Sequence, residues 1–226
     1  MIKQDIKGII GGSSQVEMNR ILITGPNNPL AQNILNQIIE NYPKSEILTL
    51  SRGNCVNNFQ KLVKHYSIDL GGSIPTFNDI DMLIHTASCV PATAESNNQF
   101  MRVNYEGSMM LIEKINFNSD AKILNISSSS VYDDSSVDVL DESSIKTIEN
   151  PYGLSKLMFE KFLENFFNNS SINFLSVRVP VLLIKNVQNN FISKWKKNIE
   201  DGKPITIFNP NSNLNACFLG SDIFPF

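Results

Sequence analysis

Tyr152 and Lys156 are the two residues whose types and spacing most directly suggest chemistry. They stand four residues apart, so on a helix they would share one face. A free phenol titrates near pH 10, too high for a base at neutral pH, but a neighbouring ammonium lowers that pKa by about 1–3 units. The pair therefore predicts a tyrosine general base activated by a lysine. A solvated helix can carry the same pair by chance, so further residues have to support this interpretation.

A run of serines supplies a second set of hydroxyls. Residues 121–126 (AKILNI) are typical of a buried strand, and Ser127–Ser130 follow directly. Polar groups at the carboxyl end of a strand lie where open α/β sheets bind ligands. One of these hydroxyls is therefore expected to hydrogen-bond a substrate oxygen and share its proton with Tyr152. The alternative for the serines is a polar loop without function.

The turn after the first apolar strand is a candidate phosphate site. Residues 20–24 (RILIT) lead into Gly25, and a helix with Pro29 at its first position is expected to follow. Such a turn presents backbone N–H groups and the positive end of a helix dipole to a pyrophosphate. Gly25, Asn28, Pro29 and Leu30 are therefore predicted to bind a dinucleotide. An ordinary strand–turn–helix connection explains this segment equally well.

Arg52 bears on which dinucleotide would bind. It follows the second predicted strand, where an acidic residue would select the ribose 2′-hydroxyl of NAD and an arginine would accommodate the 2′-phosphate of NADP. Ser51 and Arg52 offer no acid at that position, so NADP is favoured over NAD. The alternative is that Arg52 is a solvated surface charge.

The elements that must position these residues alternate along the chain. Strands are predicted at 20–24, 46–50, 66–68, 80–85, 121–126 and 174–179. Helices are predicted at 29–41, 56–64, 97–116 and 152–167. The 97–116 helix has apolar residues available for its inner face, namely Phe100, Val103, Met110 and Leu111. This alternation predicts βαβ units around a parallel sheet, a Rossmann-type doubly wound α/β fold.

The chain is divided accordingly into three parts. Residues 1–19 are interpreted as an N-terminal extension and 20–180 as the NAD(P)-binding Rossmann domain. Residues 181–226 are interpreted as part of a substrate-binding region, with a helix near 191–200 and strands at 205–208 and 216–219.

Several short motifs complete a family pattern. They are Asp69-Leu70, Ile84-His85-Thr86-Ala87-Ser88, Val103-Asn104-Tyr105-Glu106-Gly107, Ser127–Tyr132, Asn150–Glu160, Arg178-Val179-Pro180 and Gly202–Ile207. With the turn above, they resemble the extended short-chain dehydrogenases, which are NAD(P)-dependent nucleotide-sugar epimerases and dehydratases. The resemblance covers about residues 20–223.

The resemblance implies roles for particular residues. Ser128 would be the catalytic serine beside Tyr152 and Lys156. It also implies cofactor-binding residues in five segments: Asp69 and Leu70 beside the adenine, Thr86, Ala87 and Ser88 after the fourth strand, Asn104, the Tyr152–Lys156 pair, and Pro180 towards the nicotinamide. A homodimer formed through the 97–116 and 152–167 helices is implied in the same way.

The sequence departs from the family pattern at three places. Asn28 and Ala31 replace the second and third glycines of T-G-x-x-G-x-x-G, and Asn28 is expected to tolerate the positive φ of such a turn. Ser129 and Ser130 replace the Asp-Glu pair of the sugar dehydratases, which disfavours dehydration. The chain stops where the family's last helices would begin. The substrate pocket is therefore expected to be incomplete or finished by another subunit, or the chain is a truncated form.

Bulk composition excludes several other classes. The net charge is −3 without a basic half, which disfavours nucleic acid as a partner. No apolar run reaches the ~18 residues of a membrane span, and the three dispersed cysteines are typical of free thiols in the cytoplasm. His65 and His85 lie outside any metal-ligand cluster, so no metal site is expected.

Two functions are compatible with these observations. The first is an NAD(P)-dependent nucleotide-sugar epimerase or ketoreductase that uses Ser128, Tyr152 and Lys156 for hydride and proton transfer at a sugar carbon. The second is a non-catalytic nucleotide-binding or scaffolding descendant of the same fold. The degenerate turn favours the second function, and the complete Ser-Tyr-Lys set favours the first.

Overall fold

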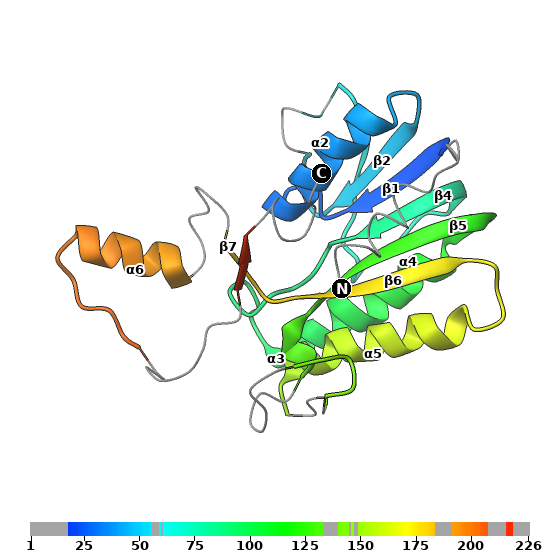
Figure 1. The fold of residues 1–226 in the computed structure, drawn as a ribbon. Coiled ribbons are helices and arrows are strands. Elements are labelled where there is room, and N and C mark those ends of the chain that lie inside the picture. Colours follow the sequence, from blue (N-terminus) through cyan, green and yellow to red (C-terminus); the bar gives the residue numbers. More distant parts are fainter. Residues whose placement is uncertain are drawn as a thin grey trace.

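A six-stranded parallel sheet forms the centre of the molecule (Figure 1). The computed structural model describes residues 18–55, 59, 61–132, 140–144, 146, 149–183, 191–207 and 216–218. The strands are β1 (Arg20–Thr24), β2 (Glu46–Ser51), β3 (Lys64–Ser67), β4 (Phe77–His85), β5 (Ile115–Ser128) and β6 (Asn173–Val179). Their order is β3-β2-β1-β4-β5-β6 and every pairing is parallel. This confirms the predicted doubly wound α/β fold. Because the strand order reverses between β1 and β4, ligands are expected at the carboxyl ends of these strands.

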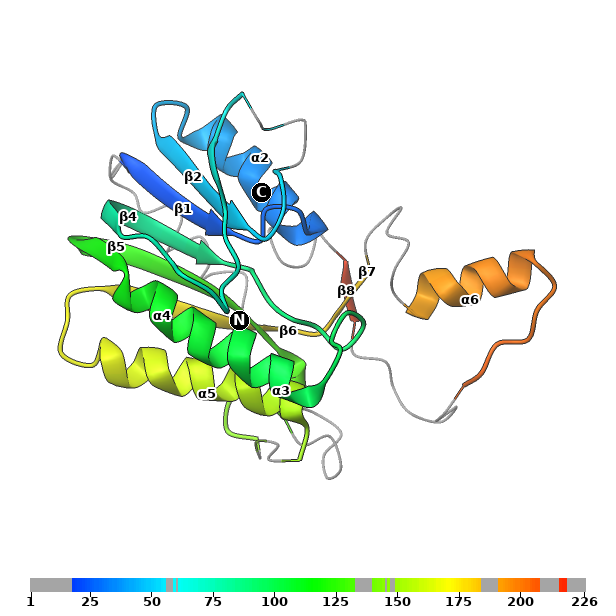
Figure 2. The same cartoon turned by 180° about the vertical axis from the view of Figure 1, so that it is seen from behind.

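Helices cover both faces of the sheet (Figures 1 and 2). One face carries α2 (Pro29–Asn41). The other carries α3 (Asn97–Phe100), the π-helix η2 (Met101–Gly107), α4 (Ser108–Glu113) and α5 (Pro151–Phe166). Successive side chains of a strand point to opposite faces. In β1, Ile21 and Ile23 accordingly join the core cluster under α2, whereas Leu22 joins the cluster under α4 and α5.

The spacing of apolar residues explains why α2 forms where it was predicted. Leu30, Ile34, Leu35 and Ile38 recur at helical intervals, and all four side chains are buried against the sheet. Pro29 occupies the start of the helix, where its missing N–H costs no intrahelical hydrogen bond.

The predicted 97–116 helix is shorter than expected and irregular. It ends at Glu113, and its middle is the π-helix η2. Ile115 instead begins β5 and pairs with Phe77 of β4, which accounts for the end of the helix. Phe100, Val103 and Leu111 are buried as predicted, but Met110 is 38% exposed, so its assignment to the inner face was wrong.

Two other predictions need correction. Residues 56–58 and 60 of the helix predicted at 56–64 lie outside the described residues, and the described residues 61–63 form a turn and a bend instead of an α-helix. Lys64 already belongs to β3, where the next residue, His65, hydrogen-bonds Thr49 of β2. No strand forms over the described residues 203–207. A strand that was not predicted, β7 (Val181–Leu183), pairs in parallel with β8 (Ala216–Phe218).

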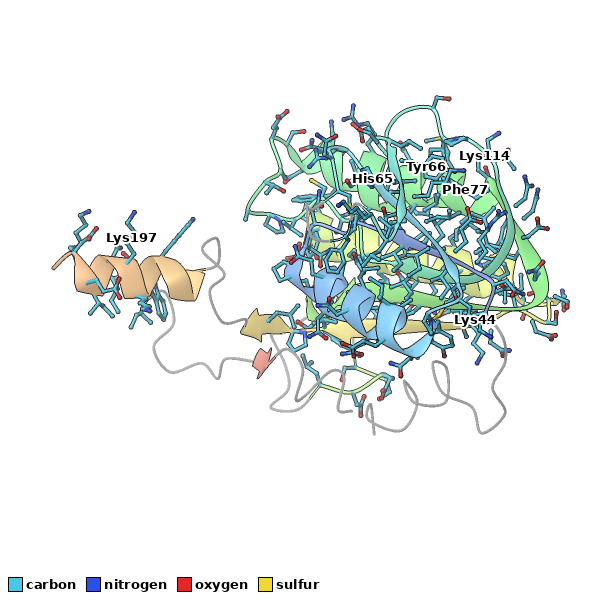
Figure 3. The ribbon with its side chains drawn as sticks, turned by 90° about the horizontal axis from the view of Figure 1, so that it is seen from above. Lys44, His65, Tyr66, Phe77, Lys114 and Lys197 are labelled. Carbon is cyan, nitrogen blue, oxygen red and sulfur yellow. The ribbon has the colours of Figure 1, made fainter. Side chains whose placement is uncertain are left out.

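The C-terminal elements follow directly after Pro180, which separates β6 from β7. The predicted helix α6 (Phe191–Glu200) is present and lies away from the sheet, and Figure 3 shows its Lys197 at this remote position. In the described part of the chain, none of the helices is both long and apolar enough to cross a membrane.

Candidate active site

The turn after β1 depends on Gly25. Its φ is +66°, a conformation that L-residues with side chains rarely adopt. A Cβ atom here would lie 2.9 Å from Cα of Ala87, in the loop that follows β4. The Gly25 N–H also donates to the Leu50 carbonyl of β2 (2.8 Å). Only glycine can therefore bring the β1 turn this close to the end of β4.

Asn28 does not have the positive φ that the sequence suggested. Its φ is −81° and its ψ 149°, because it serves as the N-cap of α2. The side-chain Oδ1 accepts the Ala31 N–H at 2.8 Å. The side-chain Nδ2 donates to the Gly25 carbonyl at 2.8 Å and to Thr86 Oγ1 at 2.7 Å. The sequence correctly placed Asn28 in the turn, but the residue acts through its side chain and not through its backbone conformation.

His85 connects the carboxyl ends of β1 and β4 to α4. Thr24 Oγ1 accepts the N–H groups of Thr86 (3.1 Å) and Ala87 (3.0 Å), so its own hydrogen points to His85 Nδ1 at 2.9 Å. His85 Nε2 must then carry the ring hydrogen and donate to Ser108 Oγ at 2.9 Å. Burial, aided by the charge of Lys156, lowers the pKa of His85 to about 3, so the ring is neutral.

Asn104 of η2 holds the segment after β4 in place. Its Oδ1 accepts the Cys89 N–H at 2.7 Å and the Ser88 hydroxyl at 3.1 Å. Its Nδ2 donates to the Cys89 carbonyl (3.0 Å) and to Ser155 Oγ of α5 (3.1 Å). The side chain is 1% exposed. Asn104 therefore ties Ser88 to the helix that carries Tyr152.

Gly107, the last residue of η2, allows this π-helix to approach the loop after β3. A Cβ on Gly107 would lie 2.4 Å from the Leu70 carbonyl oxygen, so no other residue fits. The family motif around Asn104 and Gly107 thus positions Leu70 as well as Ser88. Asp69, the neighbour of Leu70, is exposed and accepts the Gly71 N–H with its Oδ1 (3.1 Å).

Tyr152 lies with the hydroxyls of Ser128 and Ser88 at the carboxyl edge of the sheet. Asn150 caps α5 and fixes its first turn by accepting the N–H groups of Tyr152 and Gly153. The Tyr152 ring packs edge-on against Phe100 at a centroid distance of 5.6 Å. Burial raises the pKa of Tyr152, against a lowering by hydrogen bonds with Ser128 and Ser88. The sequence-based expectation of a lowered pKa was wrong, because burial outweighs these contributions.

Lys156 lies one helical turn after Tyr152 and is 2% exposed. Its ammonium donates to the Ile126 carbonyl of β5 at 2.7 Å. Burial lowers the pKa of Lys156 to about 8, although the nearby Glu160 carboxylate acts in the opposite direction. A lysine with this pKa carries a proton at neutral pH and can release it at little cost.

A buried ion pair next to Lys156 was missed by the sequence analysis. Arg178 of β6 binds Glu160 of α5 through Nε (3.2 Å to both carboxylate oxygens) and Nη2 (2.7 Å to Oε2). Arg178 Nη1 also donates to the Tyr132 hydroxyl at 2.7 Å. Both residues belong to the family motifs Asn150–Glu160 and Arg178-Val179-Pro180. The sequence indicated their pairing only in that each places a charge, of opposite sign, near positions predicted to be buried.

The remaining predicted residues lie around this centre. Pro29 and Leu30 begin α2, Thr86 and Ala87 follow β4, and Pro180 follows β6. Arg52 is exposed at the end of β2, at the same edge of the sheet. On α6, Lys194, Lys196 and Lys197 are exposed to solvent.

The site can be compared with what a nicotinamide dinucleotide requires. The turn at Gly25 and the cluster of Ser128, Tyr152 and Lys156 lie at the switch point of the sheet, where the diphosphate and the nicotinamide of such a molecule would bind. The diphosphate contact at this turn is reduced, because Pro29 has no N–H and the Ala31 N–H is already bound to Asn28. The residues therefore fit the cofactor, with fewer phosphate donors than the fold normally offers.

Solved structures with the same fold include several nucleotide-sugar epimerases. UDP-glucose 4-epimerase of Thermotoga maritima with UDP-glucose aligns over 88% of this chain and 69% of its own, with a TM-score of 0.70 and 17% identity. UDP-N-acetylglucosamine 4-epimerase of Methanobrevibacter ruminantium M1, in complex with UDP-N-acetylmuramic acid, aligns over 90% and 70% (TM-score 0.71, 17% identity). UDP-glucuronic acid 4-epimerase of Bacillus cereus, with UDP-glucuronic acid and NAD, aligns over 88% of this chain and 69% of its own. Its TM-score is 0.70 and its sequence identity 19%.

The family itself is shown by the sequence. No curated protein matches this chain. Residues 21–216, however, match the profile of the NAD dependent epimerase/dehydratase family. This range begins in β1, includes the Gly25 turn and the residues from Ser88 to Lys156, and ends at β8. The chain therefore belongs to the NAD dependent epimerase/dehydratase family, whose members include extended short-chain dehydrogenases.

Proposed function

We propose that this chain is an NAD(P)-dependent epimerase or ketoreductase that acts on a nucleotide sugar. The observation that carries the proposal is the meeting of Tyr152 with the Ser128 and Ser88 hydroxyls, one helical turn from the buried ammonium of Lys156. Packing alone would not require a lysine that is 2% exposed beside a tyrosine and two serines. The family and the nucleotide-sugar epimerases that share the fold support the same reaction class.

Each side chain has a defined task in this proposal. Ser128 hydrogen-bonds the reacting oxygen of the sugar, and Tyr152 gives that oxygen a proton or takes one from it. The raised pKa of Tyr152 keeps its phenol protonated at neutral pH, which is the form that a ketone oxygen needs. Lys156 supplies a positive charge one helical turn from Tyr152. The bound nicotinamide would accept or donate the hydride.

Three finer features belong to the same proposal. NADP is preferred over NAD because Arg52 stands exposed at the end of β2, without an acidic residue beside it. The chain forms a homodimer through the helices on the α4 and α5 face. The cysteines support a cytoplasmic location, since Cys55 and Cys89 are buried thiols and not disulfides.

The experiment begins with the cofactor. The purified protein is denatured, any released nucleotide is identified by chromatography, and NADH and NADPH are then titrated into the protein. Tightly retained NAD favours an epimerase that recycles its cofactor, whereas stoichiometric oxidation of NAD(P)H with a keto sugar favours a reductase.

Tyr152→Phe tests the catalytic assignment. We expect the turnover of nucleotide sugars to be abolished while NADH or NADPH binds nearly as before, because only the ionisable hydroxyl is removed. Unchanged turnover in this variant would refute the assignment.

A non-catalytic nucleotide-binding or scaffolding role is the second candidate. The observation that favours it is the capped turn, in which the Asn28 side chain already occupies the Ala31 N–H. Failure to bind either dinucleotide at millimolar concentration would favour this second candidate in its scaffolding form.

A further inference from the structure

We propose that Asn28 sets how tightly this chain binds a dinucleotide, because its side chain competes with the diphosphate for the first turn of α2. This inference rests on the proposed function, since it concerns the same cofactor. It assigns to Asn28 a role that is specific to this chain, where the family pattern has glycine.

The first turn of α2 has few N–H groups left for a phosphate. Pro29 has none, the Ala31 N–H is bound to Asn28 Oδ1 at 2.8 Å, and the Gln32 N–H is bound to the Asn28 carbonyl at 3.0 Å. Among the described residues, no group accepts from the Leu30 N–H. A diphosphate therefore finds one available donor, and it gains the Ala31 N–H only if the Asn28 side chain moves away.

Moving the Asn28 side chain is costly because both ends of its amide are bound. Nδ2 donates to the Gly25 carbonyl and to Thr86 Oγ1 (2.8 and 2.7 Å). Thr86 is a buried residue, and its Oγ1 itself donates to the Thr24 carbonyl at 2.6 Å. The Asn28 amide thus spans the β1 turn and the end of β4, the two segments between which a dinucleotide would lie. A glycine at this position would leave both the space and the N–H group available.

Fixed charge does not compensate for the missing donors. Residues 25–32 (GPNNPLAQ) contain no lysine or arginine. Attraction of a diphosphate to this turn therefore depends on the backbone N–H groups and the dipole of α2. For this reason a single capping side chain is expected to have a large effect on affinity.

The test is the dissociation constant of NADH and NADPH for the full chain, measured by fluorescence titration. Asn28→Gly is expected to bind about tenfold more tightly, because it frees the Ala31 N–H, and a glycine N-cap costs a helix little stability. Asn28→Asp is the matched control: its carboxylate keeps the cap and adds negative charge, so binding is expected to be no tighter than in the unchanged protein. ADP-ribose, which has the diphosphate but no nicotinamide, should show the same gain with Asn28→Gly.

Hydrogen exchange at the Ala31 amide gives a second measurement that does not depend on activity. This amide should be protected in the unchanged protein and in Asn28→Asp, exposed in Asn28→Gly, and protected again when NADH is added to Asn28→Gly. Equal dissociation constants for the unchanged protein and Asn28→Gly, or an equal gain in Asn28→Asp, would overturn the inference and leave the proposed function intact. If no folded variant binds either dinucleotide, the inference and the proposed function both fail.

Discussion

At the scale of single residues, Lys156 is a residue of the proposed site whose buried charge also lowers the stability of the folded chain. A charged lysine that is 2% exposed destabilises the folded chain, since burial disfavours the ammonium form. The hydrogen bond of its ammonium to the Ile126 carbonyl compensates only in part. Residues that are kept despite such a cost are candidates for function.

Lys156→Met is expected to stabilise the protein while abolishing turnover. The pKa of Lys156 is lowered from 10.5 to about 8, which corresponds to about 3 kcal/mol at ~1.4 kcal/mol per pH unit. The lost hydrogen bond removes about 1 kcal/mol of this gain, so the free energy of unfolding at pH 7 should rise by about 2 kcal/mol. Urea unfolding at pH 7 measures this difference.

The pH dependence gives the control for this prediction. Between pH 8 and 10.5 the unfolded chain holds a proton on Lys156 that the folded chain has lost, so the stability of the unchanged protein should increase with pH in this window. Lys156→Met should lack this increase. Lys161→Met, which removes an exposed lysine of the same helix, should keep it. An unchanged slope in Lys156→Met would contradict the prediction.

At the scale of elements, α5 and β6 are joined by the Glu160–Arg178 ion pair. The Glu160 side chain is 3% exposed and that of Arg178 17%, and Arg178 also binds Tyr132. The pair fixes the helix that carries Tyr152 and Lys156 against the end of the sheet. A buried pair of this kind is costly to break, because the remaining charge stays buried without its partner.

Glu160→Gln is expected to destabilise the protein by about 3–5 kcal/mol, since it leaves the Arg178 charge uncompensated. The matched control is Glu164→Gln, one turn further along α5. Glu164 pairs with Lys161 at 2.6 Å on the surface, where both side chains are about half exposed (46% and 58%). Its loss should change the free energy of unfolding by less than about 1 kcal/mol. Similar effects of the two substitutions in urea unfolding would show that the buried pair has no special role.

At the scale of the whole molecule, His85 connects elements from both halves of the sheet to the helical layer. It bonds Thr24 of β1 and Ser108 of α4 from its own place at the end of β4, and its ring packs against Phe159 of α5 at 5.2 Å. Burial keeps this ring neutral far below the ordinary pKa of a histidine. Protonation of a single residue is therefore linked to global unfolding.

Stability should decrease as the pH falls from 6.5 towards 3. In this window the unfolded chain binds a proton at His85 that the folded chain, with a pKa of about 3, does not bind. The expected loss between pH 6.5 and 5 is about 2 kcal/mol. His85→Gln should lose this part of the pH dependence, even if its stability at pH 7 is lower. An equal decrease in both proteins, measured by urea unfolding at each pH, would assign the effect to other groups.

The proposed homodimer also belongs to this scale. Met110 of α4 and Phe166 of α5 are 38% and 49% exposed, and α4 and α5 run side by side in Figure 2. Phe166→Glu would place a charge in the proposed interface and is expected to shift the protein towards monomer in sedimentation velocity. Ile199→Glu, which changes an exposed apolar residue of α6, is the control. A monomeric unchanged protein would refute the dimer.

The sequence by itself determined the order and type of most elements. The apolar run at 20–24 and the helical spacing of apolar residues in 29–41 are local patterns, and the structure has β1 and α2 at these residues. The predicted 97–116 helix failed at its end because pairing of Ile115 with β4, which is distant in sequence, decides where β5 begins. The motifs also identified the residues that gather at the carboxyl edge, since parallel strands place their ends together.

Only the tertiary structure decided the state of those residues. The pKa of Tyr152 is raised and that of Lys156 lowered, because both effects depend on how much of the fold surrounds each group. The Glu160–Arg178 pair joins residues from α5 and β6 that no periodicity connects. Asn28 was expected to replace a glycine by its backbone, but its contact with Thr86, 58 residues away, makes it a cap. Long-range contacts set charge and hydrogen bonding, and these are the properties that a sequence pattern does not contain.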